Sequence, residues 1–156
     1  MNTSLSKNGY KIKKSELDPR KIKEIKDDLN VKPFTFPKNQ KIDNSFQVYL
    51  ESPKKLYLPR FYGIEKFGTP VINEITEGDS IHLKFKGGLR PEQEPIKKVF
   101  IDNARKNGGG IISIKCGGGK TVLALNIIAE LKKKTIVAVH KDFLMTQWRD
   151  RILEFL

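Results

Sequence analysis

A glycine-rich stretch followed by lysine and threonine, at residues 116–121 (CGGGKT), has the composition of a phosphate-binding loop. Glycines let backbone N–H groups converge on phosphate oxygens, and the Lys120 ammonium would neutralise the β- and γ-phosphates of a nucleotide. The Thr121 hydroxyl is suited to bind Mg²⁺, and a helix that begins here adds its positive N-terminal end to the same anion site. The pattern therefore predicts phosphate binding.

The loop departs from the full pattern G-x-x-x-x-G-K-[ST], because its first position is Ile114. One alternative is a plain glycine-rich turn between a strand and a helix. A dinucleotide-binding fingerprint that begins at Gly117 is a poor competitor, because it would need glycine where Val122 stands. Cys116 next to a helix N-terminus could be a reactive thiol. No general base stands at a recognisable spacing from it, so we interpret it as a small packing residue.

The elements around the loop alternate between helix and strand. A helix is expected up to about residue 106, a buried strand at 111–115 (IISIK), an apolar helix at 120–133 and a second buried strand at 135–139 (TIVAV). Asp142 is expected to cap a final helix. This order predicts an α/β fold, with 111–115 and 135–139 as parallel strands joined by a right-handed crossover.

The first 86 residues have a different pattern. We expect residues 1–39 to be a basic segment with a mobile tail and a short helix at about 19–29, which begins at Asp18-Pro19. Residues 40–86 are predicted to be a small β-rich unit. Residues 46–52 and 55–59 flank a turn, and 81–86 alternate apolar and polar side chains, as a half-buried strand does. Residues 87–156 form the third predicted domain.

Charge favours a polyanionic partner. The chain has 30 Lys and Arg against 18 Asp and Glu, a net charge of +12, of which 13 basic and 7 acidic residues lie in 87–156. Nucleic acid or nucleotide phosphates fit this excess, although a lysine-rich solubility charge is the simpler alternative. The single cysteine excludes an internal disulfide framework. No apolar run is long enough to span a bilayer and no secretory signal is visible, so we expect an intracellular protein with no membrane partner.

Three segments in fixed order resemble a known family: LRPEQ at 89–93, IKCGGGKT at 114–121, and VAVHKDFLMTQW at 137–148. Together they resemble the start of a superfamily 2 helicase motor. The resemblance is strongest to the branch with the xeroderma-pigmentosum-B type helicases and the transcript-release helicases of poxviruses and other large DNA viruses. An aliphatic residue at the position of Ile114 is expected in that branch, whereas Lys115 departs from its usual proline. Residues 48–68 look like the leader of the viral members.

The resemblance implies a fold, cofactors and site residues. The fold would be a partial RecA-like lobe, with parallel strands covered by helices, and the cofactors ATP and Mg²⁺. Gln93 would hydrogen-bond the adenine edge, Arg90 would support the base or the phosphates, and the loop would hold the phosphates, with Mg²⁺ on Thr121. The nucleic-acid backbone, of DNA or RNA, would meet His140, Lys141 and Gln147. Trp148 is expected to pack in the core. The protein would act in transcription or DNA repair, in the host cytoplasm or virion if viral and otherwise in the nucleus or cytoplasm.

Other parts of the family pattern are missing after the loop. No Asp-Glu pair follows Thr121, and the family's coupling motif and second lobe are also absent. We therefore interpret the chain as the first part of a larger helicase, inactive in hydrolysis alone, with the remainder of the helicase in trans as a candidate partner. Two alternatives stay open: a phosphate-loop NTPase of another class, and a non-catalytic nucleic-acid-binding remnant.

Overall fold

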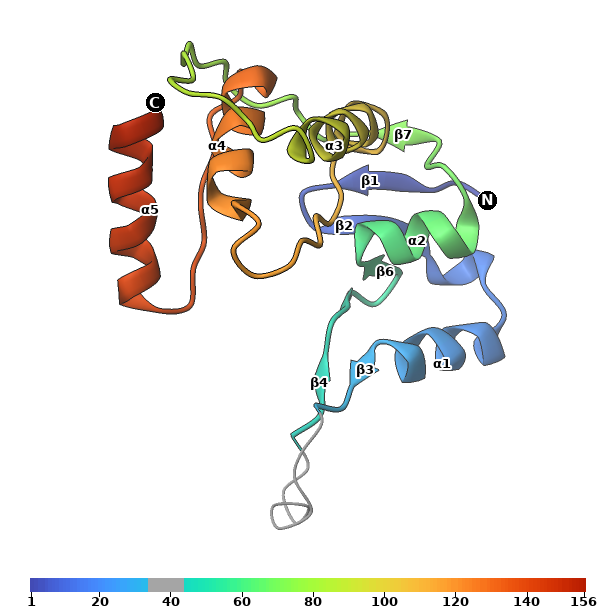
Figure 1. Ribbon diagram of the computed structural model, residues 1–156. Helices are drawn as coiled ribbons and strands as arrows, with labels where there is room; N and C mark the ends of the chain where they lie inside the picture. The colour runs from blue at the N-terminus through green and yellow to red at the C-terminus, as the bar shows by residue number, and fades with distance from the viewer. Residues whose placement is uncertain (34–43) are drawn as a thin grey trace. The chain divides into compact units, whose positions relative to one another are not determined.

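The computed structural model describes residues 1–33 and 44–156, and Figure 1 shows the chain. The chain divides into two compact units, unit 1 (Met1–Thr76) and unit 2 (Glu77–Leu156). The predicted boundary between residues 39 and 40 lies outside the described residues. Helices and strands are both present, so the chain is of mixed α/β class.

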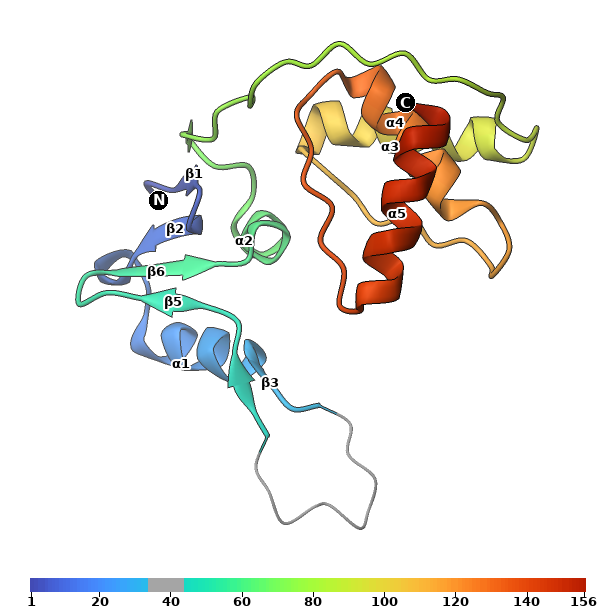
Figure 2. The same ribbon diagram turned by 90° about the vertical axis from the view of Figure 1, so that its left-hand side faces the viewer.

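A five-stranded sheet is the centre of unit 1. Its order is β5-β6-β2-β1-β7, and Figure 2 shows β5, β6 and β2 side by side. All pairs are antiparallel except β1–β7, which is parallel. The strands are β1 (Ser4–Ser6), β2 (Gly9–Lys13), β5 (Leu50–Glu51), β6 (Lys55–Leu58) and β7 (Ile72–Asn73). Strands β3 (Asn30–Val31) and β4 (Phe46–Gln47) form a separate antiparallel pair.

The turn at residues 52–55 and the N-terminal residues of unit 1 can be compared with the predictions from the sequence. The turn between β5 and β6 is confirmed, with Ser52 N donating to Lys55 O at 2.9 Å. The expected mobile tail is wrong, because β1 and β2 form a hairpin that is hydrogen-bonded on both sides. The physical reason is that Tyr10 and Ile12 alternate with lysines and are both fully buried. Apolar burial on one face is enough to order this lysine-rich strand.

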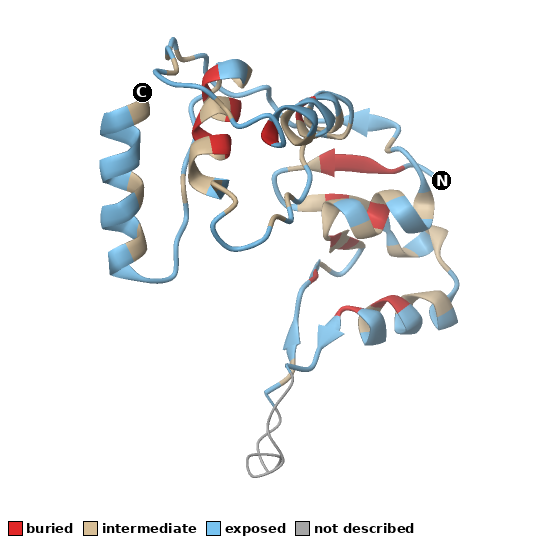
Figure 3. Cartoon of the chain, in the orientation of Figure 1, coloured by how far each residue is buried: buried red, intermediate tan, exposed pale blue. Residues whose placement is uncertain are grey.

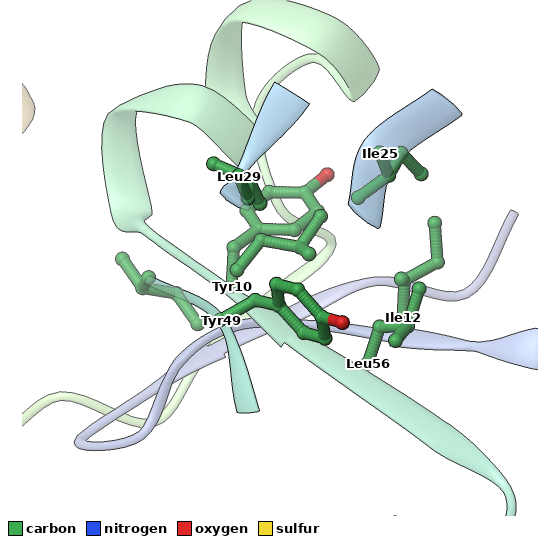
Figure 4. Close-up of a cluster of buried hydrophobic side chains, with 8 residues drawn as sticks. Tyr10, Ile12, Ile25, Leu29, Tyr49 and Leu56 are labelled. Atoms are coloured by element: carbon green, nitrogen blue, oxygen red, sulfur yellow. The ribbon is translucent and has the colours of Figure 1, made fainter. Parts of the chain in front are cut away.

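Helices cover one face of this sheet. Helix α1 (Pro19–Asp28) begins as predicted, because the Asp18 side chain accepts a hydrogen bond from Arg20 N at 2.7 Å. A short 3₁₀ turn, η1 (Lys14–Glu16), precedes it. Helix α2 (Arg60–Phe67) was not predicted. Figure 4 shows the core where α1 meets the strands; its buried side chains are Leu5, Tyr10, Ile12, Ile25, Leu29, Tyr49, Leu56 and Leu58.

Unit 2 has three helices where the sequence predicts them. They are α3 (Gln93–Asn107), α4 (Lys120–Leu131) and α5 (Asp142–Phe155). Buried Ile101 of α3 packs with Leu123 and Ile127 of α4. Helix α5 has no buried residue, as Figure 3 shows, and its cap position is Lys141. The expectation that Asp142 is the cap is therefore wrong by one residue, because Asp142 already has helical geometry in the first turn.

The predicted parallel pair in unit 2 is not formed, and a RecA-like lobe is not confirmed. Residues 111–115 and 135–139 have no regular secondary structure and belong to no strand ladder. Ile112 and Ile114 pack on the α3–α4 core, whereas Ile111 is 97% exposed and Ile136 is 96% exposed. A sheet of two strands is marginal by itself. In the described part of unit 2 no further strand adjoins either segment, so neither segment gains a ladder.

Residues 81–86 show the predicted alternation without the predicted strand. Ile81, Leu83 and Phe85 are half-buried, while the residues between them are exposed. Phe85 stacks on Phe155 of α5 with ring centroids 5.6 Å apart. Within the described ranges, no helix combines the length and the apolar character that crossing a membrane requires.

Candidate nucleotide-binding site

The glycine-rich loop lies between residues 111–115 and the first turn of α4. Gly117 and Gly119 both have left-handed backbone conformations, with φ of 76° and 72°. Glycine adopts this region without the steric cost that a side chain brings. Gly118 N donates to Lys115 O at 3.1 Å, which closes the turn. The backbone path of the loop therefore favours glycine at positions 117 and 119.

Gly118 is also restricted by close packing. A Cβ atom at this position would lie 2.4 Å from Ile114 Cγ2 and 3.0 Å from Lys115 O. The aliphatic side chain that replaces the first glycine of the general pattern thus packs directly under the middle glycine. Ile114 in turn belongs to the half-buried residues around the α3–α4 core. The Ile114 side chain therefore connects the loop to the core of unit 2.

Helix α4 begins at the loop and presents its N-terminal end there. Gly119 is the cap residue, and the first turn closes with Leu123 N donating to Gly119 O at 3.0 Å. The N–H groups of residues 120–122 precede the first intrahelical bond, so they are available to an anion at the helix end. Thr121 is half-buried in this first turn. These donors fit the phosphates of a nucleotide, with the Thr121 hydroxyl as an oxygen ligand for Mg²⁺.

The Lys120 side chain folds back on the loop. Its Nζ donates to Ile114 O at 2.7 Å and to Lys115 O at 2.9 Å. The residue is exposed, so water reaches the ammonium group. Two carbonyls thus hold the ammonium beside the glycines, and phosphate oxygens could replace them as acceptors. Sequence reasoning identified Lys120 but not these two backbone partners.

Gln93 is the side chain that joins α3 to the loop. It is 2% exposed, which rules out a solvent-facing helix position. Its Nε2 donates to Gly118 O at 2.9 Å and Gly119 O at 3.3 Å, and its Oε1 accepts from Arg90 N at 3.0 Å. Both amide hydrogens are therefore used by the loop, while Oε1 keeps a second lone pair.

Arg90 makes a second connection between the LRPEQ segment and the loop. Its guanidinium donates to Gly117 O at 3.2 Å, and its backbone O accepts from Gln93 N at 2.9 Å. The structure thus brings Arg90 and Gln93 to the loop, although they stand about 25 residues before it. All three glycine carbonyls of the loop are fixed by these two residues.

The remaining predicted residues lie apart from this network. Cys116 is exposed, which corrects its interpretation as a packing residue: the turn places it outside the core. His140 and Lys141 are exposed at the N-terminal end of α5, and Gln147 is exposed further along that helix. Trp148 is half-buried. Near the site, hydrogen bonding to Glu94 raises the pKa of Lys97, which also pairs with Glu130 of α4 at 3.5 Å.

Comparison with known proteins agrees with this arrangement. Residues 86–156 match the family described as type III restriction enzyme, res subunit. The chain is 36% identical over 156 residues to "Putative ATP-dependent RNA helicase L396" of Acanthamoeba polyphaga mimivirus, covering 96% of this chain and 30% of that protein. It is 34% identical over 147 residues to "Putative helicase 161L" of Invertebrate iridescent virus 6, covering 93% of this chain and 31% of that protein.

A shorter match involves a cellular protein. The general transcription and DNA repair factor IIH helicase/translocase subunit XPB of Schizosaccharomyces pombe is 33% identical over 75 residues, covering 48% of this chain and 9% of that protein. The chain thus spans under a third of the length of the two viral relatives. The loop geometry, the LRPEQ connection and these matches lead to one conclusion: the chain is part of a superfamily 2 helicase, related to viral helicases and to XPB-type helicases and translocases.

Proposed function

We propose that this chain is the ATP-binding first part of an ATP-dependent nucleic-acid helicase or translocase. Residues 87–156 would begin its ATP-binding lobe. The observation that carries the proposal is the bracing of the glycine loop by Gln93 and Arg90, because it joins the two segments that the resemblance assigns to base and phosphates. A phosphate-loop NTPase of another class would share the loop without this LRPEQ connection.

Each residue of the loop has a role in this proposal. ATP supplies the phosphoryl group when it is bound, and Mg²⁺ offsets the phosphate charge. The N–H groups at the start of α4 donate to the phosphates, and the Lys120 ammonium moves from the two loop carbonyls to phosphate oxygens. The Thr121 hydroxyl would be an oxygen ligand of Mg²⁺. Arg90 and Gln93 keep the glycine carbonyls turned away from the phosphates, so the N–H groups face them.

Adenine recognition by Gln93 remains part of the proposal in a restricted form. Its Nε2 is committed to Gly118 and Gly119, so the atom left for the base is Oε1, which can accept from the exocyclic amine of adenine. The same side chain would then position the phosphate loop and contact the base. Guanine carries an oxygen at the equivalent position, and it would offer Oε1 no donor there.

The nucleic-acid contact is proposed at the start of α5. His140 and Lys141 are exposed at the N-terminal end of this helix, where backbone N–H groups favour an anion. Gln147 is exposed on the same helix. We propose that these three residues meet the phosphate backbone of DNA or RNA, in transcription or repair.

Hydrolysis needs more than the loop provides. Phosphoryl transfer requires coordinated metal, a positioned water and stabilisation of the developing charge together. Among the described residues no group of three His, Cys, Asp or Glu side chains gathers that could hold a metal ion. We therefore propose ATP binding, with turnover by these 156 residues alone below about 1 s⁻¹, the lower end of ordinary enzyme rates.

The test is a calorimetric titration of the full chain with ATP and Mg²⁺. Lys120→Ala should weaken ATP binding by about 1–3 kcal/mol, the range for a charge-assisted hydrogen bond. Lys84→Ala, which removes an exposed lysine outside the loop, is the matched control for the change in net charge and should leave the affinity unchanged. Equal ATP affinity for the wild type and Lys120→Ala would refute the site.

A further inference from the structure

The sheet of unit 1 has one covered and one open face. Alternate residues of the central strands, Tyr10 and Ile12 of β2 and Leu56 and Leu58 of β6, are buried under the helices. Helix α2 approaches so closely that a Cβ on Gly63 would lie 2.2 Å from the Tyr10 ring. The helices therefore cover the face with the apolar side chains, and the intervening residues of β2 and β6 lie on the other face.

The strand register identifies what the open face carries. Residues paired across neighbouring strands share a face. Tyr57 pairs with Lys11, and Lys55 pairs with Lys13. Lys11 also pairs with Ser4, whose hydroxyl is buried without a hydrogen-bond partner among the described residues. The open face thus presents one aromatic ring among three lysines at its centre.

This face is hollowed into a groove of about 690 Å³. The groove is lined by four basic side chains and by one acidic side chain, that of Glu74. Glu74 forms an ion pair with Lys11 at 3.0 Å. Among the described residues, the side-chain ammonium groups of Lys7 and Lys55 form no ion pair or hydrogen bond, and Lys55 bonds Ser52 Oγ only through its backbone. Tyr57 also lines the groove. The basic residues are Lys7, Lys11, Lys55 and Arg60.

This combination points to a nucleic-acid strand. A protein core that covered the face would have to desolvate several lysines, which is costly unless each gains a partner. A polyanion supplies those partners along its whole length. An aromatic ring among cations on a sheet is a platform on which an unpaired base can stack, and it suits a single strand because a duplex keeps its bases stacked inside.

We propose that the open face of the unit 1 sheet, centred on Tyr57, Lys11 and Lys55, binds single-stranded nucleic acid. The lysines would contact the phosphates and Tyr57 would stack on a base. The site is separate from the helicase contacts proposed at α5, and it does not depend on ATP binding. It would be a second nucleic-acid-binding site of the chain, formed by residues of unit 1 alone.

The first experiment measures binding of a labelled 20-nucleotide single strand by fluorescence anisotropy, using the full chain. The double variant Lys7→Gln/Lys55→Gln removes two charges from the groove. The matched control is Lys23→Gln/Lys32→Gln, which removes two exposed charges from unit 1 outside the groove. We expect roughly tenfold weaker binding for the groove variant and a salt slope smaller by about 1.4, since each phosphate contact on a single strand contributes about 0.7.

The second experiment tests the stacking role of Tyr57. Tyr57→Leu keeps an apolar side chain in the strand and should weaken binding roughly tenfold with an unchanged salt slope, while an abasic strand should bind the wild type and the variant equally. Thermal unfolding of each variant checks that the sheet is intact. Lys141→Glu reports separately on the α5 contact, so loss at one site is distinguished from loss at the other.

Three results would overturn the proposal. One is equal effects of the groove variant and its control on strand binding. Another is a Tyr57→Leu variant that loses as much affinity for the abasic strand as for the strand with bases. The third is a groove variant that loses binding to phosphatidylserine vesicles while it binds the single strand normally, because the face would then be a membrane-surface site.

Discussion

Replacement of Gln93 tests the link between α3 and the phosphate loop. Gln93→Ala removes three hydrogen bonds, to Gly118 O, Gly119 O and Arg90 N, from a side chain that is 2% exposed. A net contribution of about 0.5–1.5 kcal/mol for each bond gives an upper sum near 4.5 kcal/mol. The bond to Gly119 O is long at 3.3 Å, and the half-buried glycine carbonyls can regain water. We therefore expect unit 2 to lose about 1–3 kcal/mol.

The isosteric change Gln93→Glu separates hydrogen bonding from packing. It keeps the shape but turns an oxygen toward two carbonyl oxygens, so that acceptors face acceptors in a buried position. It should destabilise unit 2 at least as much as Gln93→Ala at pH 7. If Gln93 only filled space, Gln93→Glu would instead be the milder variant. Gln147→Ala, the same truncation at an exposed glutamine of α5 in unit 2, should change stability by less than about 0.5 kcal/mol.

The assay is urea unfolding followed by tryptophan fluorescence. The chain has one tryptophan, Trp148, and it lies in α5, so the signal reports on unit 2. ATP titration of the same proteins should show roughly tenfold weaker binding for Gln93→Ala, because a loosened loop must be ordered by the nucleotide, at a cost of about 1.4 kcal/mol. If both Gln93 variants unfold and bind ATP as the wild type does, the bracing role is refuted.

Two further predictions follow from close packing and from charge. Gly118→Ala should abolish ATP binding while circular dichroism shows α4 intact, because the new Cβ would lie 2.4 Å from the Ile114 side chain. The control Gly88→Ala places its Cβ in open space and should bind ATP normally. Equal ATP affinities of the two variants would contradict the packing argument for Gly118. In unit 1, hydrogen bonds from two lysines lower the pKa of Glu51 below its ordinary 4.5. Its carboxylate therefore stabilises unit 1 above about pH 4.5, and this contribution is lost as the pH falls through the lowered value. Glu51→Gln should be less stable than the wild type in urea at pH 7 and equally stable at pH 2; a difference that persists at pH 2 would contradict this.

Much of the helix content could be predicted from the sequence because the signals are local. Asp18-Pro19 marks the start of α1, and the side chain of Asp18 caps it as expected. The β1–β2 hairpin also has a local signal that the lysine content obscured. Asn8-Gly9 precedes an alternating run in which Tyr10 and Ile12 face the core. Asparagine-glycine before such a run is a strong hairpin signal.

Helix α2 could not be predicted from local signals, because glycine in a helix interior usually weakens it. Proline and glycine are typical of turns, and here Pro59 and Gly68 are the cap positions of the helix. Gly63 lies inside the helix because the Tyr10 ring occupies the space where a side chain would be. This contact joins residues far apart in the chain, and no pattern within residues 60–67 indicates it.

In the candidate site, too, some residues could be predicted from local sequence and others depend on the fold. The loop composition predicts Lys120 and Thr121, since phosphate chemistry requires them next to each other. The role of Gln93 as a brace depends on the approach of α3 to α4, which only the fold defines. Sequence reasoning placed Gln93 at the base through resemblance, and the structure adds its hydrogen bonds to two glycine carbonyls.

The bracing explains how the loop keeps its form without a strand ladder behind it. Residues 111–115 pair with no strand, yet Ile112 and Ile114 pack on the α3–α4 core, and Gln93 and Arg90 fix the three glycine carbonyls from the other side. These bonds go to backbone atoms, so they constrain the path of the loop whatever its side chains are. Displacement of the glycines would therefore either break these bonds or move the N-terminal end of α3 together with the loop.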